Sequence, residues 1–139
     1  MRFIAIDLET ANPRMSSICQ IGIVTFEDGR EVDAEAILVN PDDYFDPYNV
    51  AIHGITAEHV SSAPTFSEIH SKLCELTSGQ IVACHTLFDR VALAQACSKH
   101  SLDHQHEGAR KSRFRAVLSQ SSTPIRWSNE RIGLHESMD

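Results

Sequence analysis

The sequence predicts an α/β fold, a mixed sheet flanked by helices that is incomplete at its C-terminus. Three observations support this prediction. Residues 2–8 form an apolar run typical of a central strand, and residues 17–40 alternate like a hairpin about an Asp28-Gly29 turn. After residue 65, helical and strand patterns alternate along the chain. The sheet is therefore expected to start antiparallel, and the alternation that follows implies an α/β sandwich.

The remaining elements follow from spacing and turn residues. The segment 40–49, rich in Pro, Asp and Asn, is predicted to be a loop. A capping box at Thr65 to Glu68 and apolar residues at spacings of three and four predict a helix that ends before Gly79. A short buried strand is expected over 80–84 and a second helix over 87–100, with Phe88 in the core.

The pattern fades after Leu102. Residues 103–139 are rich in Arg, Ser and His and predict neither a strand nor an amphipathic helix. We therefore expect an α/β domain over residues 1–102 and an atypical, weakly structured tail over 103–139. A replaced terminus, such as a change of reading frame gives, is our hypothesis for this tail.

Composition limits the class of protein. The 139 residues, 42% of them hydrophobic, suffice for one domain with a core. The net charge of −7 argues against broad electrostatic attraction to nucleic acid. The four cysteines are far apart and lie among apolar neighbours, which indicates buried thiols in a reducing compartment. Because Asp7 interrupts the first apolar stretch, neither a signal peptide nor a membrane span is expected, and we predict a cytoplasmic protein.

Three acidic residues are candidates for a metal site. Asp7 and Glu9 end the first strand on one side of it, and Asp89 lies at the start of the helix that follows the strand over 80–84. Carboxylates gathered at one edge of a sheet suit Mg²⁺ or Mn²⁺, and two such ions can catalyse displacement at phosphorus. The alternative is structural, with solvent-facing acids on the strand and a first-turn carboxylate that interacts with the helix dipole.

Three short motifs resemble a known family. "DLET" after a strand, "IHGIT" after a Pro/Asp-rich loop and "FD" after "IVACHT" together resemble the DnaQ-like, DEDDh-type 3′ to 5′ exonucleases, related to the proofreading subunit of bacterial DNA polymerase III. The resemblance covers residues 2–102. It implies a ribonuclease-H-like sheet, two-metal hydrolysis of phosphodiesters, and binding of a single-stranded DNA or RNA 3′ end. It also raises association with a polymerase as a hypothesis.

The resemblance also implies roles for individual residues. Asp7 would bridge two metal ions, Glu9 would bind the ion on the nucleophile side, and Asp89 would bind the other. Thr10 would lie beside the 3′-terminal nucleotide. The "IHGIT" stretch would wall that pocket through His53, Gly54, Ile55 and Thr56.

Some of these positions have structural alternatives. His53 is equally well explained as a turn histidine that is satisfied by the backbone, and Gly54 by the turn's need for backbone freedom. His85 stands where relatives commonly have Asn. It is a candidate substrate-binding residue, although a histidine at a strand end is more often structural.

The family's last motif, a His followed five residues later by Asp, is missing after Asp89. The nearest substitute is His135 with Asp139, only four residues apart, as candidate general base and last metal ligand. His104 and His106 are weaker candidates for the base.

The sequence thus predicts a 3′ to 5′ exonuclease-type domain. An inactive relative that at most binds metal or nucleic acid is the alternative. A phosphatase with an aspartate nucleophile ranks third, because it would usually have a second Asp where Glu9 stands.

Overall fold

A computed structural model describes residues 1–84, 87–102 and 113–116, the last four in backbone only. Five strands form one mixed sheet in the order β3-β2-β1-β4-β5. The elements in chain order are β1 (Arg2–Thr10), β2 (Ile18–Glu27), β3 (Arg30–Leu38), α1 (Pro47–His53), α2 (Phe66–Thr77), β4 (Ile81–Cys84), α3 (Leu87–Lys99) and β5 (Arg113–Ala116). The predicted α/β class with a mixed sheet is confirmed.

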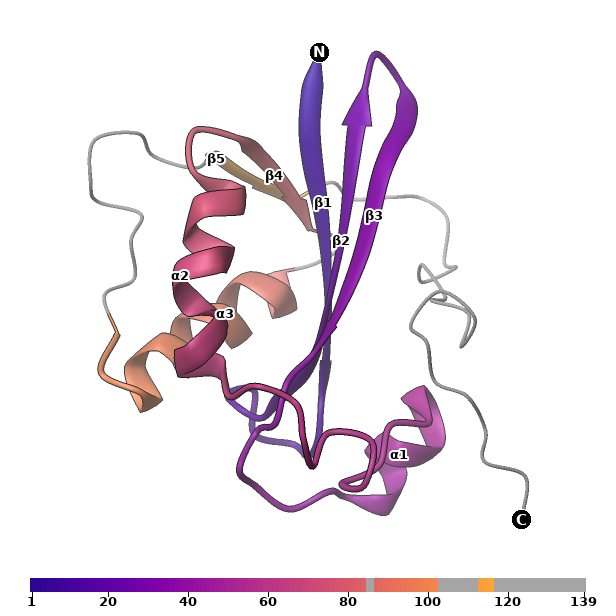
Figure 1. Ribbon diagram of the computed structural model, residues 1–139, viewed down its shortest axis with the longest axis vertical. Helices are drawn as coiled ribbons and strands as arrows, with labels where there is room; N and C mark the ends of the chain where they lie inside the picture. Colours follow the sequence, from indigo (N-terminus) through magenta and orange to yellow (C-terminus); the bar gives the residue numbers. More distant parts are fainter. Residues whose placement is uncertain (85–86, 103–112, 117–139) are drawn as a thin grey trace.

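The central strand β1 and the β2–β3 hairpin determine how the strands of the sheet pair. β1 pairs antiparallel with β2 and parallel with β4. The turn between β2 and β3 has positive φ at both Asp28 (50°) and Gly29 (79°), as a tight two-residue hairpin requires. Figure 1 shows β1 between β2 and β4, running toward the end of the molecule where α1 lies.

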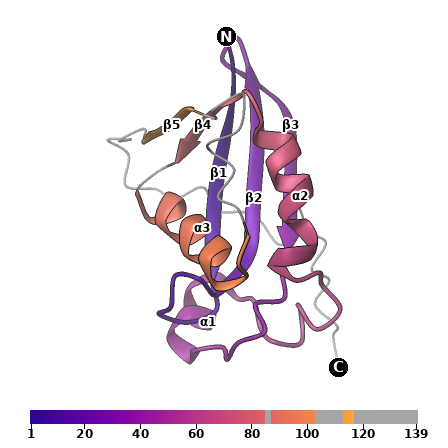
Figure 2. The same ribbon diagram turned by 90° about the vertical axis from the view of Figure 1, so that its left-hand side faces the viewer.

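The core lies on one face of the sheet. Side chains along β1 alternate, with Ile4, Ile6 and Leu8 buried and Asp7 and Glu9 on the other face. The buried face packs against α2 and α3, which lie side by side over the sheet (Figure 2). The two carboxylates therefore lie on the face of the sheet opposite this core.

Two predictions in the first half of the chain are corrected. The segment 40–49 is not all loop, because α1 begins at Pro47. Its start and end carry standard signals: Asp46 caps the backbone N–H of Tyr48, Pro47 is the first helical residue, and Gly54 closes the helix at φ 74°. Thr65 precedes α2 as expected but makes no side-chain capping bond, so the predicted capping box is absent.

The second half of the chain brings three further corrections. Phe88 was expected in the core but is 38% exposed, because the buried side of α3 is formed by Asp89, Ala92, Leu93, Ala96 and Cys97. Cys74 is partly exposed, whereas the other three cysteines are buried. β5 is a strand that the sequence pattern does not predict. It pairs in parallel with β4, so the sheet continues beyond Leu102.

Within the described ranges, no helix has the length and apolar character needed to cross a membrane.

Candidate metal centre

The end of β1 brings the predicted carboxylates together. Asp7 and Glu9 share one face of β1, and the carboxylate of Asp89 reaches this strand from the first turn of α3. The backbone N–H of Leu8, which lies between the two acids of β1, donates to Asp89 Oδ1 at 3.0 Å. The register of β1 with β4 ends at Ile6 and Cys84, so Asp89 supplies an acceptor just beyond the last paired residues.

The closeness of these groups shifts the pKa of Glu9. Burial first, and then the charges of Asp7 and Asp89, together raise it to about 7. Burial also raises the pKa of the Cys84 thiol to about 12, with Asp89 as the next cause. Near neutral pH the carboxylates crowd negative charge at the end of β1, and the raised pKa lets Glu9 bind a proton that partly relieves this crowding.

The donor set is chemically suited to Mg²⁺ or Mn²⁺, since all three side chains offer carboxylate oxygens. As the side chains lie, no group of three His, Cys, Asp or Glu residues in the described ranges is arranged to hold an ion. Asp89 is engaged with the backbone of β1. Metal ligation by Asp7, Glu9 and Asp89 therefore stays a prediction.

Side-chain hydrogen bonds join helix α1 to the end of β1. His53 Nδ1 accepts from the backbone N–H of Ile55 at 3.0 Å, so the proton is on Nε2, which donates to the carbonyl of Thr10 at 2.9 Å. Burial lowers the pKa of His53, and the bond to Thr10 only partly offsets it. With both ring nitrogens bonded to backbone, His53 fits the structural alternative, a turn histidine. The side-chain amide of Asn49 also donates to the Thr10 carbonyl, at 3.1 Å.

Two other predicted substrate contacts are deeply buried. Thr10 is 7% exposed and Ile55 1% exposed, and Ile55 packs with Ala11, Cys19 and Val60 in a second small core. Contact of Thr10 and Ile55 with a nucleotide stays a prediction.

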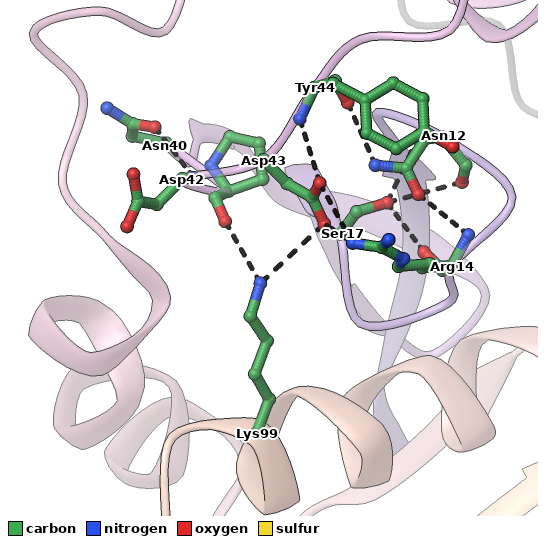
Figure 3. Close-up of polar contacts among 9 residues, drawn as sticks. Asn12, Arg14, Ser17, Asn40, Asp42, Asp43, Tyr44 and Lys99 are labelled. Carbon is green, nitrogen blue, oxygen red and sulfur yellow. Dashed lines mark hydrogen bonds and ion pairs between the residues drawn. The ribbon is translucent and has the colours of Figure 1, made fainter.

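A polar cluster holds the loop that leads into α1 (Figure 3). Asp43 binds Arg14 at 3.4 Å and Lys99 at 3.8 Å, which joins the segment after β1, the loop and the end of α3. Asn12 donates to the carbonyl of Tyr44 at 2.9 Å. Burial by itself would raise the pKa of Asp43, but hydrogen bonds from Tyr44 and Asn12 and the charges of Arg14 and Lys99 hold it below its ordinary value. These contacts fix the loop against the segment after β1 and the C-terminal end of α3.

The remaining predicted site residues lie outside the described ranges. These are His85, His104, His106, His135 and Asp139. Sequence reasoning missed Asn49 and Asp46, although the Asp-Pro pair followed by Gly54 is a recognisable signal for a short helix.

A family model described as Exonuclease (RNase_T) matches residues 4–123. The chain belongs to the exonuclease family. No curated protein matches the sequence. The family match extends past Leu102, where the predicted domain ends, and includes β5.

Solved structures agree with this assignment at the level of the fold. The chain is similar to exonuclease I in a structure of SSB/exonuclease I with the inhibitor CFAM, with a TM-score of 0.74 and 15% identity. The matched region includes 84% of this chain and 28% of the exonuclease I chain. The zinc-ion-bound form of an E. coli exonuclease I complex with single-stranded DNA matches with a TM-score of 0.72 and 16% identity, over 84% of this chain and 28% of the exonuclease I chain. The nuclease domain of 3′hExo, a DEDDh family member bound to rAMP, matches with a TM-score of 0.63 and 18% identity, over 73% of this chain and 60% of the 3′hExo chain.

These likenesses show that this exonuclease-family chain has the ribonuclease-H-like fold. The chain spans about a quarter of the length of exonuclease I and under two thirds of the 3′hExo chain.

The raised pKa of Glu9 predicts how stability depends on pH. In the folded protein Glu9 keeps its proton up to about pH 7, whereas the unfolded chain loses it near 4.5, so this group destabilises the fold increasingly between these values. The full shift corresponds to about 3 kcal/mol, and solvent screening at this partly exposed side chain reduces it to about 1–2 kcal/mol. Without metal, Glu9→Gln should raise the free energy of unfolding by that amount at pH 8 and leave it unchanged at pH 4.5.

Urea unfolding at both pH values measures this effect. Glu75→Gln, at an exposed position on α2, is the control and should behave like the parent chain. An equal effect of Glu9→Gln at both pH values would contradict the crowding of charge at this site.

The bond between Asp89 and β1 predicts a difference between two substitutions. Asp89→Ala removes the acceptor of a buried N–H and should cost about 1–3 kcal/mol of unfolding free energy in the absence of metal. Asp89→Asn keeps an acceptor oxygen while it removes the charge, so it should cost clearly less. Equal losses in urea unfolding at pH 8 would show that the Leu8 bond contributes nothing.

Proposed function

We propose that this chain is a 3′ to 5′ exonuclease-type domain of the DEDDh subgroup, which hydrolyses nucleic-acid phosphodiesters with divalent metal ions held by Asp7, Glu9 and Asp89. The observation that carries the proposal is the gathering of three carboxylates at the end of β1, where burial and mutual repulsion raise the pKa of Glu9 to about 7. Such crowding is costly unless positive charge enters the site. The relation to DnaQ and to the proofreading subunit of a polymerase belongs to the same proposal and rests on the sequence motifs.

The position of the carboxylates supports binding of a polyanion by an acidic chain. With a net charge of −7, the chain has little general attraction for phosphates, and bound cations would reverse the charge where the substrate binds. When bound, divalent ions supply a metal-activated water and stabilise the charge that develops on the leaving oxygen. We propose Mg²⁺ or Mn²⁺ as the ions and a single-stranded DNA or RNA 3′ end as the substrate.

The protein's own residues would provide orientation. Asp7 and Glu9 are two residues apart on a strand that is fixed by β2 on one side and β4 on the other. Asp89 is held against the same strand through Leu8. His53 and Asn49 bind the Thr10 carbonyl, which fixes the strand end and places α1 beside the carboxylates. In this proposal His53 acts as a positioning residue rather than as a substrate contact.

An alternative function has a specific observation in its favour. The sequence contains no His followed five residues later by Asp after Asp89, so the family's general base and last metal ligand are not identified. A chain without them would be a metal- or nucleic-acid-binding module that is catalytically inactive. His135 and Asp139 are the candidates for the general base and the last metal ligand, and a chain in which they fill these roles would be active.

A nuclease assay separates the two functions. The purified chain is incubated with a 5′-labelled single-stranded oligonucleotide and Mn²⁺, and the products are resolved at single-nucleotide length. We expect stepwise shortening from the 3′ end, reduced at least about 100-fold by Asp7→Ala because a metal ligand is lost. Asp33→Ala, at an exposed position on β3, should leave the rate unchanged.

The negative results are also informative. Shortening that persists in Asp7→Ala would contradict the proposed site. No shortening by a folded chain that still binds Mn²⁺ would favour the inactive binding module. If activity is present, His135→Ala and Asp139→Ala would then test the candidate base and the last ligand.

A further inference from the structure

Gln20 is a buried polar residue for which the fold alone gives no reason. Its side chain lies on β2 and is 3% exposed. Its amide Nε2 is a buried side-chain polar atom without a hydrogen-bond partner in the described part of the chain. An unpaired buried amide costs about 1–3 kcal/mol, so its presence in a folded protein calls for an explanation.

The register places Gln20 directly opposite Glu9. Directly opposed residues of an antiparallel pair point to the same face of the sheet, with Cβ atoms about 5 Å apart. The same register stacks the rings of Phe3 and Phe26 with centroids 4.9 Å apart, which confirms that opposed side chains share a face in this ladder. The side chains of Gln20 and Glu9 therefore leave the sheet next to each other on the same face.

A bulge sets this pairing apart from the rest of the strand. The register shifts between Glu9 and Thr10, where β2 has Cys19 as an extra residue. The Cys19 thiol turns toward the backbone carbonyl of Glu9, at 3.5 Å. Glu9 and Gln20 are thus the last regular pair of the β1–β2 ladder before the bulge, and Gln20 is held close to the site by strand pairing on both sides.

The chemistry of the pair is complementary. An ionised carboxylate accepts hydrogen bonds through both oxygens, and an amide N–H₂ is a donor only. When a carboxylate binds a metal ion through one oxygen, a donor on the other oxygen fixes its orientation, and loss of such a donor typically lowers metal affinity 10- to 100-fold.

We propose that Gln20 is a positioning residue for Glu9, whose buried Nε2 amide donates to the Glu9 carboxylate when that carboxylate binds a divalent cation. This inference rests on the proposed function, because it requires Glu9 to be a metal ligand. It explains why a single polar side chain interrupts the apolar run "ICQIGIV" of β2.

Mn²⁺ binding to the full chain, measured by isothermal titration calorimetry at pH 7.5, tests the inference. Gln20→Met keeps the length of the side chain and removes the amide. We expect its Kd for Mn²⁺ to rise about 10- to 100-fold. Gln95→Met, on the exposed side of α3, is the matched control and should bind as the parent chain does.

Stability without metal gives a readout that distinguishes positioning from a purely structural role. Removal of an unpaired amide should leave the free energy of unfolding unchanged or raise it, so weaker Mn²⁺ binding by Gln20→Met cannot then be attributed to unfolding. A Kd within threefold of that of the parent chain would overturn the role of Gln20. Absence of Mn²⁺ binding by the parent chain would overturn the proposed metal site together with this inference.

If Gln20→Met does not fold, NMR of the parent chain still tests the inference. The side-chain amide protons of Gln20 are followed by ¹H–¹⁵N NMR while Mg²⁺ is added. We expect them to shift downfield and to exchange more slowly with solvent as the new hydrogen bond forms. Saturation with Mg²⁺ without a change in these resonances would overturn the inference.

Discussion

Repulsion among the carboxylates at the end of β1 is the constraint that the surrounding structure has to accommodate. Asp7 and Glu9 lie on one face of a strand, and Asp89 approaches the same strand from α3. The cost of this arrangement appears at Glu9, whose pKa rises to about 7 because of burial first and the two neighbouring charges next. A fold selected for stability alone would separate these groups. A divalent cation bound at the proposed site would supply the positive charge that relieves this repulsion.

Several elements serve to hold this unfavourable arrangement in place. β2 pairs with β1 along its whole length and β4 pairs with it as far as Ile6, and Asp89 supplies the acceptor for Leu8 beyond the end of the β4 pairing. α1 has no fully buried residue, and the bonds from His53 and Asn49 to the Thr10 carbonyl attach it to the end of β1. The cluster around Asp43 then fixes the loop before α1. Most polar contacts near the site are therefore structural supports.

The sequence predicts the parts of the fold that follow from periodicity and turn chemistry. Alternation identifies β1 and the hairpin with its Asp28-Gly29 turn, and helical spacing identifies α2 and α3. α1 is missed because its seven residues carry no apolar periodicity, although Asp46 and Gly54 mark its ends. β5 is missed because four residues that include Arg113 and Arg115 lack the apolar pattern of a central strand, and only tertiary pairing with β4 makes them a strand.

The site is predictable to the same degree. The carboxylates and the ability of Asp89 to reach a neighbouring strand follow from the order of strands and helices. The roles of His53 and Ile55 do not, since a motif cannot tell whether a side chain faces a pocket or the backbone of its own turn. In the structure His53 is satisfied by backbone and Ile55 is core. Gln20 likewise becomes notable only when the register shows that it lies opposite Glu9.

A crystal structure of this chain soaked with Mn²⁺ and measured at the manganese absorption edge tests the central claim most directly. The account predicts an anomalous peak bound by carboxylate oxygens of Asp7 and Glu9, with Asp89 turned toward the same ion or toward a second one. A crystal in which Mn²⁺ binds only elsewhere on the chain, with these three carboxylates unchanged, would contradict it.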